Sequence, residues 1–325
     1  MANYLVTGAA GFIGSRLTEM LIEQGHTVTG VDNLNNAYDV HMKEYRLWKL
    51  QDLDGFTFQK LDISERSNVE TVERSSVPFE AVINLAARAG VRESVENPGV
   101  FLETNVIGTL NLLEMCRRNG IRKFILASTS SIYGANAPLP TPETADSDHP
   151  LQPYAASKKA AEVLCHAYHS LYDIDVSVVV YFTVYGPAGR PDMSMFRFTR
   201  WISESEPVRI YGDGEQSRGF TYVDDIARGT ILALKPPGYE IINLGGHEVI
   251  TMNALIALLE KRIGKKAILE THPPNPADML TSQADVTKAR NLLGWQPQVG
   301  LEEGVSRMVD WYNAEREWAK NISMG

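Results

Sequence analysis

The segment Tyr4-Leu5-Val6-Thr7-Gly8-Ala9-Ala10-Gly11-Phe12-Ile13-Gly14 decides the fold class of this chain. The apolar run before Gly8 is typical of a β-strand, and residues 12–24 carry apolar side chains at helical spacing. Three glycines between them fit a loop that lets the backbone approach a pyrophosphate, whose charge the N-terminus of the helix stabilises. In this strand–loop–helix context, the glycine triplet predicts a dinucleotide-binding site.

The first half of the chain alternates short β-branched runs with helical patterns. We expect strands at residues 4–7, 27–31, 57–61, 81–85, 124–128 and 176–182. The alternation is typical of βαβ units, so it predicts an α/β fold with a doubly wound, Rossmann-like parallel sheet. After Gly186 the pattern becomes irregular. We therefore expect residues 1–186 to form a dinucleotide-binding domain that carries the catalytic residues. Residues 187–325 should form a smaller, mixed α/β lobe for the substrate, with some segments crossing back to the large domain.

Composition excludes several classes of protein. The chain has 325 residues, 44% of them hydrophobic, and a net charge of −9, which is typical of a soluble globular protein and argues against a surface for nucleic acid. Its two cysteines, Cys116 and Cys165, cannot make a disulfide framework and have no metal-ligand spacing. No leader signal is evident, and no apolar run approaches 18 residues. We expect a cytoplasmic enzyme with no metal and no membrane partner.

Two acidic residues end predicted strands near the glycine loop. Asp32 follows Gly14 by 18 residues, where a carboxylate accepts hydrogen bonds from the adenosine ribose and repels a 2′-phosphate. This favours NAD over NADP. Asp62 ends the third predicted strand and is placed to meet the adenine, although a cap at the strand end is an alternative interpretation.

A tyrosine and a lysine four residues apart, Tyr154 and Lys158, open a predicted helix after Pro153. This spacing puts the phenol and the ammonium on one face of the helix. A cation about 4 Å from the phenol, at an effective dielectric constant near 20, would favour the phenolate by about 4 kcal/mol. Such a tyrosine can take a proton from a sugar hydroxyl. The pattern alone is common on solvated helices, but together with the glycine loop it predicts dehydrogenase chemistry.

With these motifs in place, the chain resembles the extended short-chain dehydrogenase/reductase family of NAD-dependent nucleotide-sugar epimerases and dehydratases over essentially its whole length. Further motifs that carry the resemblance are Asn84-Leu85-Ala86-Ala87, residues 128–134, residues 181–187 and Arg218…Tyr222-Val223-Asp224-Asp225. The resemblance implies NAD as cofactor and Thr129, Tyr154 and Lys158 as catalytic residues. It implies cofactor contacts from Gly8, Gly11, Phe12, Ile13, Gly14, Asp32, Asp62, Ile63, Ala86, Ala87, Tyr154, Lys158 and Tyr181. Ser130 and Ser131 stand where the dehydratases carry Asp-Glu, which argues against dehydration.

The resemblance also indicates the substrate. Residues 35–43 and 181–193 are similar to the corresponding segments of UDP-glucuronate 4-epimerases. It therefore implies inversion of carbon 4 of a UDP-hexuronic acid through a transient 4-keto intermediate. We expect Arg190 at the carboxylate, with a surface ion pair as the alternative, and Arg218 at the diphosphate. The implied substrate contacts are Thr129, Ser130, Thr183, Arg190, Met195, Arg218 and Asp278.

Three positions depart from the family pattern. Val180 and Gly219 stand where many relatives carry arginine and aspartate, and Ala277 replaces a glycine. Three other functions remain open: a UDP-glucose 4-epimerase, a UDP-glucuronate decarboxylase, and an NAD-sensing scaffold without activity. The resemblance further implies a homodimer formed by helices near residues 103–117 and 155–171.

Overall fold

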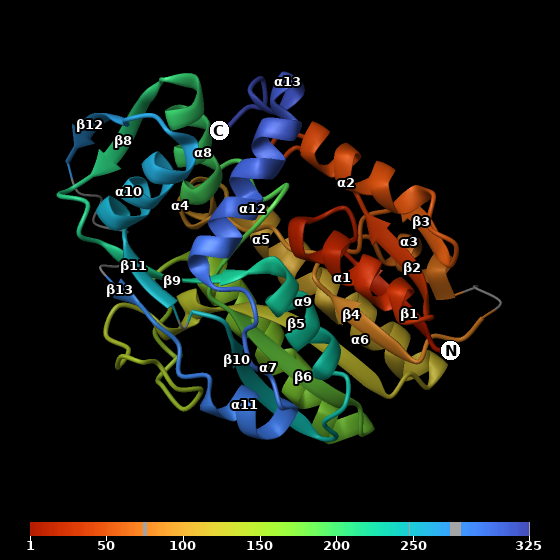
Figure 1. Cartoon of the computed structure of the whole chain (residues 1–325). Coiled ribbons are helices and arrows are strands. Elements are labelled where there is room, and N and C mark those ends of the chain that lie inside the picture. Colours follow the sequence, from red (N-terminus) through yellow and green to blue (C-terminus); the bar gives the residue numbers. More distant parts are fainter. Residues whose placement is uncertain (74–76, 247, 274–280, 325) are drawn as a thin grey trace.

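The glycine-rich segment lies in the middle of a seven-stranded parallel sheet in the computed structural model, which describes residues 1–73, 77–246, 248–273 and 281–324 (Figure 1). The strand order is β10-β6-β5-β4-β1-β2-β3. The strands are β1 (Asn3–Thr7), β2 (Thr27–Asp32), β3 (Phe56–Lys60), β4 (Ala81–Asn84), β5 (Lys123–Thr129), β6 (Asp175–Tyr181) and β10 (Tyr239–Leu244). Six match the predicted strands to within one residue at either end, so the predicted fold class is confirmed.

The strand order reverses beside β1, which pairs with β2 on one edge and with β4 on the other. In doubly wound sheets such a reversal opens a crevice at the carboxyl ends of the strands, where ligands bind. Strands β4, β5 and β6 are almost wholly buried, because helices cover both faces of the sheet.

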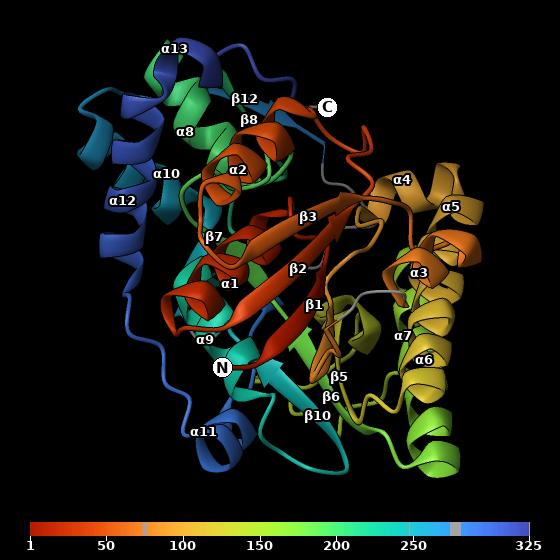
Figure 2. The same ribbon diagram turned by 90° about the vertical axis from the view of Figure 1, so that its right-hand side faces the viewer.

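Two helical layers enclose the sheet (Figure 2). One face packs against α1 (Phe12–Glu23), α9 (Val223–Leu232) and α11 (Thr287–Leu293). The other packs against α3 (Arg66–Glu73), α6 (Gly108–Asn119) and α7 (Pro153–Tyr172). The short α4 (Val91–Glu96), α5 (Pro98–Leu102) and the π-helical turn η1 (Glu103–Ile107) lead into α6, and α2 (His41–Gln51) contacts α1. A 3₁₀ turn, η2 (Ser130–Tyr133), follows β5.

A second, smaller core lies over the carboxyl edge of the sheet (Figure 1). Its strands are β7 (Thr183–Tyr185), β9 (Ser217–Tyr222), β11 (Glu248–Thr251) and β13 (Thr281–Ser282), and a separate pair joins β8 (Pro207–Tyr211) to β12 (Ile268–His272). Its helices are α8 (Ser194–Glu204), α10 (Met252–Ile263), α12 (Leu301–Ala314) and α13 (Arg316–Ala319). Strand β10 and helices α9 and α11 lie after Gly186 in the chain but pack in the core of the large sheet. The domain boundary at Gly186 stays a prediction.

Both cysteines, Cys116 and Cys165, are free and buried against the sheet. Burial raises the pKa of each thiol. Within the described ranges, no helix has both the length and the apolar character to cross a bilayer, and no cluster of His, Cys, Asp or Glu is arranged to hold a metal.

Candidate active site

A cavity of about 1130 Å³ lies between the carboxyl edge of the large sheet and the smaller core. Sites for one small molecule usually measure about 300–1,000 Å³, so this cavity has room for two ligands side by side. The sites predicted from the sequence meet here. Its lining includes Gly8, Gly11, Phe12, Ile13, Gly14, Asp32, Asp62, Ile63, Ala86, Ala87, Thr129, Ser130, Tyr154, Lys158, Tyr181, Thr183, Arg190 and Arg218.

The glycine loop is closed so tightly that side chains would not fit. Gly8 has a φ of +69°, and a Cβ there would lie 2.8 Å from the backbone nitrogen of Ala86. A Cβ on Gly14 would lie 2.1 Å from the carbonyl oxygen of Gly8. The N-cap of α1 is Gly11, which has no side chain to cap the helix, and no other side chain of the described residues bonds its first N–H groups. The loop therefore fits a pyrophosphate.

Asp32 is buried at the end of β2, as the predicted ribose site requires. Its Oδ1 accepts a hydrogen bond of 2.8 Å from the backbone of Leu34 and lies 3.8 Å from the Nζ of Lys43. Burial alone would raise the pKa of the nearby Asp62, but hydrogen bonds from Ser64 and Asn33 outweigh it and lower that pKa. Both carboxylates are held in fixed orientations at the cavity wall.

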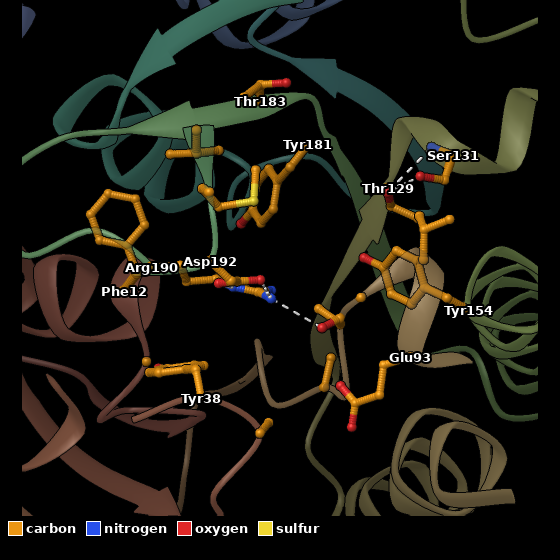
Figure 3. Close-up of a pocket in the computed structure, with 18 of the residues that line it drawn as sticks. Phe12, Tyr38, Glu93, Thr129, Ser131, Tyr154, Tyr181, Thr183, Arg190 and Asp192 are labelled. Carbon is orange, nitrogen blue, oxygen red and sulfur yellow. Dashed lines mark hydrogen bonds and ion pairs between the residues drawn. The ribbon is translucent and has the colours of Figure 1, made fainter. Parts of the chain in front are cut away.

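Tyr154 stands at the start of α7, with its ring edge-on to Phe101 and its hydroxyl on the cavity side beside Thr129 (Figure 3). Thr129 ends β5, and its Oγ1 accepts a hydrogen bond of 3.2 Å from the backbone of Ser131. Burial raises the pKa of the Tyr154 phenol, while Thr129 and then Arg190 partly offset that rise. The phenol is half-buried at the cavity and has polar neighbours at its oxygen.

Lys158 lies one turn further along α7, but its ammonium is turned toward the sheet. Its Nζ donates a hydrogen bond of 2.8 Å to the carbonyl of Ala127 in β5. Burial lowers the pKa of Lys158 to about 8, and the buried carboxylate of Glu162 counteracts this. The sequence analysis expected the ammonium of Lys158 to lower the pKa of the Tyr154 phenol. In the protein without ligands that pKa is raised instead, and burial is the main cause.

Arg190 projects into the cavity between Tyr38 and Tyr154 (Figure 3). Its Nε and Nη2 donate hydrogen bonds of 3.0 and 2.6 Å to the two carboxylate oxygens of Asp192, and Nη2 also reaches the carbonyl of Ala89 at 3.1 Å. Among the described residues Nη1 has no hydrogen-bond partner. One edge of the guanidinium is fixed by Asp192, and the other remains for an anionic ligand.

Of the three remaining residues predicted to contact the substrate, only Arg218 is found at the cavity in the described part of the chain. Arg218 lines the cavity from β9, and its neighbour must be glycine, because a Cβ on Gly219 would lie 2.3 Å from the carbonyl oxygen of Gly246. The prediction for Met195 is wrong: α8 buries Met195 in the smaller core, and Met193 lines the cavity instead. Asp278 lies outside the described residues, as does Ala277.

Several charged residues of the site were missed by the sequence analysis. Lys43, which lines the cavity, and Arg46, which lies outside the lining, are both buried on α2. A signal existed: they occupy the same helical stripe as the buried Met42, Leu47 and Leu50. Asp192, which fixes Arg190, follows it by only two residues but carried no motif of its own.

With this geometry established, comparison with known proteins identifies the family. The model of the NAD dependent epimerase/dehydratase family matches residues 4–245. The chain belongs to this family. NAD is the family's cofactor, and the glycine loop and Asp32 fit it.

Individual members of the family are similar over the full chain. The UDP-glucuronate 4-epimerase of Thermodesulfobacterium geofontis is 53% identical over 325 residues, all of both chains. The crystal structure of UDP-glucuronic acid 4-epimerase from Bacillus cereus, in complex with UDP-glucuronic acid and NAD, is 36% identical with a TM-score of 0.90, covering 96% of this chain and 99% of the other. The UDP-glucose 4-epimerase of Thermotoga maritima, crystallised with UDP-glucose, is also 36% identical, with a TM-score of 0.89 and coverage of 97% and 99%.

Proposed function

We propose that this protein converts UDP-glucuronate to UDP-galacturonate by inverting carbon 4 through a transient 4-keto intermediate on bound NAD. The observation that carries the proposal is the half-free guanidinium of Arg190 beside Tyr154 in one cavity. An epimerase for neutral sugars has no need of a cation there. The 53% identity to a UDP-glucuronate 4-epimerase supports the same substrate.

The residues divide between two ligands. The glycine loop would hold the pyrophosphate of NAD and Asp32 the adenosine ribose, with Ile63, Ala86, Ala87 and Tyr181 along the remaining wall. When bound, NAD accepts the hydrogen of carbon 4 and returns it to the opposite face of the sugar. Lys158 would orient the ribose next to the nicotinamide. Arg218 would hold the diphosphate of the sugar nucleotide.

Tyr154 would move the proton. In the proposed step its phenolate takes the proton of the 4-hydroxyl, as that carbon loses its hydrogen, and returns it after the sugar ring turns over. Thr129 stands beside the phenol and supplies a short path to the hydroxyl. The positive charge of the bound nicotinamide ring would oppose the rise in pKa that burial causes in this phenol.

The carboxylate must survive the keto stage. Oxidation of carbon 4 gives a β-keto acid, in which the bond from carbon 5 to the carboxylate can break. Carbon dioxide would leave, the electron pair would form an enolate with the carbon 4 carbonyl, and a proton from water on carbon 5 would give a UDP-4-keto-pentose. Return of the hydride removed in the first step would then reduce this ketone to a UDP-pentose. This loss is fastest when the breaking bond is perpendicular to the carbonyl plane. We propose that Arg190, with Thr183, holds the carboxylate away from that orientation.

Incubation of the purified protein with UDP-glucuronate, without added NAD, tests this proposal by proton NMR of the products. We expect UDP-galacturonate alone. A UDP-pentose as the main product would indicate a decarboxylase. Turnover of UDP-glucose but not of UDP-glucuronate would indicate a UDP-glucose 4-epimerase. If neither sugar nucleotide is converted and neither reduces bound NAD, the NAD-sensing scaffold becomes the better hypothesis.

Replacing Asp32 with alanine is expected to weaken NAD binding about 10- to 100-fold, since hydrogen bonds to a charged group contribute about 1.5–3 kcal/mol. The preference for NAD over NADP should fall further, because Lys43 then faces the 2′-phosphate without a competing carboxylate. Isothermal titration of the cofactor-free protein with each dinucleotide measures both effects. Asp52→Ala, at the exposed end of α2, is the matched control. Unchanged selectivity in Asp32→Ala would remove Asp32 from the ribose site.

We also propose a homodimer in the cytoplasm. The neighbouring helical segments α4, α5, η1 and α7 carry exposed apolar side chains, which a second copy of the chain would shield from water. These are Val95, Leu102, Ile107, Val163 and Leu171. Analytical ultracentrifugation should give about twice the chain mass of 36.1 kDa. The two free cysteines are compatible with a reducing compartment.

A further inference from the structure

Arg46 is a buried cation that the proposed chemistry does not use. Its side chain does not line the cavity itself but contacts Tyr38, which does, and only 3% of the residue is exposed. Among the described residues no carboxylate lies within ion-pair distance of it. Burying a charged group without an ion pair is costly unless hydrogen bonds satisfy it.

The hydrogen bonds of Arg46 link α2 to three segments: the glycine loop, the segment that carries Tyr38, and the loop that precedes Arg190. Arg46 Nε and Nη2 donate to the carbonyl of Ala188 at 3.0 and 2.7 Å, and Nη2 also reaches the carbonyl of Gly189 at 3.3 Å. Nη1 donates to the carbonyl of Ala10 in the glycine loop at 3.3 Å and to the hydroxyl of Tyr38 at 2.8 Å. One guanidinium thus holds the cofactor loop and the two residues that directly precede Arg190.

The same contacts hold a backbone that is otherwise unfavourable. Ala188 has a φ of +53°, a left-handed conformation that costs energy for a residue with a Cβ. The Tyr38 ring contacts both arginines, with its centroid 5.5 Å from the Arg46 guanidinium and 5.7 Å from that of Arg190. Arg46 therefore contacts both the backbone that leads into Arg190 and the aromatic ring that the Arg190 guanidinium faces.

We propose that Arg46 is the positioning residue that determines product fidelity. It holds the 188–190 loop against the glycine loop, so that Arg190 meets the substrate carboxylate in the geometry that prevents loss of carbon dioxide. This inference rests on the proposed function, since it assigns Arg46 a role only if a uronate passes through the 4-keto stage. A merely structural arginine would affect stability and total rate, but not the ratio of products.

Arg46→Lys tests the proposal, because lysine keeps the positive charge but cannot bridge three carbonyls and a hydroxyl at once. With UDP-glucuronate and saturating NAD, we expect the ratio of UDP-pentose to UDP-galacturonate to rise at least tenfold, measured by proton NMR together with released carbon dioxide. Bound NAD and the melting temperature are measured on the same preparation. Arg16→Lys, which shortens a partly buried arginine on α1 that pairs with Asp224, is the matched control and should keep the wild-type ratio.

A folded, NAD-loaded Arg46→Lys protein with the wild-type product ratio would overturn the proposal. Should that variant not fold, Tyr38→Phe decides, because it removes one acceptor of Arg46 and leaves the ring in place. A smaller leak of the same kind supports the proposal, and no leak overturns it. If the wild type itself makes no UDP-galacturonate, the proposed function fails instead, and the two failures are thereby distinguished.

Discussion

Replacing Tyr154 with phenylalanine is expected to lower kcat for UDP-glucuronate by about 10²- to 10⁴-fold, the usual contribution of a positioned general base. The variant loses a single oxygen, while its ring still packs edge-on against Phe101. We therefore expect the melting temperature and the content of bound NAD to stay at wild-type values. Steady-state kinetics, with a single-turnover record of cofactor absorbance at 340 nm, measures the loss at the oxidation step.

The control for Tyr154→Phe lies on the same helix. Tyr168→Phe also removes one phenol oxygen from α7, but that oxygen bonds Glu114, away from the cavity. It should leave kcat unchanged. A Tyr154→Phe protein that kept more than a tenth of wild-type kcat would show that another group takes the proton, and Thr129 would then be the first candidate.

Replacing Arg190 with alanine has the second largest expected effect, and it acts on two quantities. The loss of a charge-assisted hydrogen bond to the carboxylate should lower kcat/KM by roughly 100-fold, or about 3 kcal/mol. Substrate that is still oxidised should leak as UDP-pentose, because nothing then fixes the carboxylate near the carbonyl plane. Proton NMR of the products gives both the rate and the partition.

A pH profile adds an independent readout for the same variant. Arg190 lowers the pKa of Tyr154, so its removal raises that pKa, and the activity should then need a more alkaline pH to reach its maximum. Arg66→Ala, which breaks an exposed ion pair with Glu70 on α3, is the control for the loss of an arginine. Wild-type kinetics and no pentose from Arg190→Ala would mean that this arginine only pairs with Asp192.

The sequence predicted the fold, and most of the predicted site residues line the cavity, because these features follow from local patterns. The glycine loop, Asp32 and the Tyr154–Lys158 spacing each describe backbone geometry within one strand–loop–helix unit or one helical turn. Parallel strands then bring their carboxyl ends to one edge, so residues far apart in the chain meet there without further information.

The parts that failed depend on tertiary packing. Met193 and Met195 are the same residue type two positions apart. Only the packing of α8 decides that Met193 faces the cavity and Met195 the smaller core. The orientation of Lys158 depends on the carbonyl of Ala127 in β5, which no spacing within the helix reveals. Arg46 is the clearest case, because its partners come from three separate segments and become visible only in three dimensions.

The most direct test of the account uses UDP-glucuronate that carries deuterium at carbon 4, turned over in ordinary water by protein with its own cofactor. We predict UDP-galacturonate that retains the label at carbon 4, formed more slowly than from unlabelled substrate, because the same hydrogen leaves and returns within one closed site. Loss of the label to water would show that carbon 4 inverts by proton exchange and would contradict the account. UDP-pentose as the bulk of the product would contradict the role of Arg190, although carbon 4 would still have been oxidised.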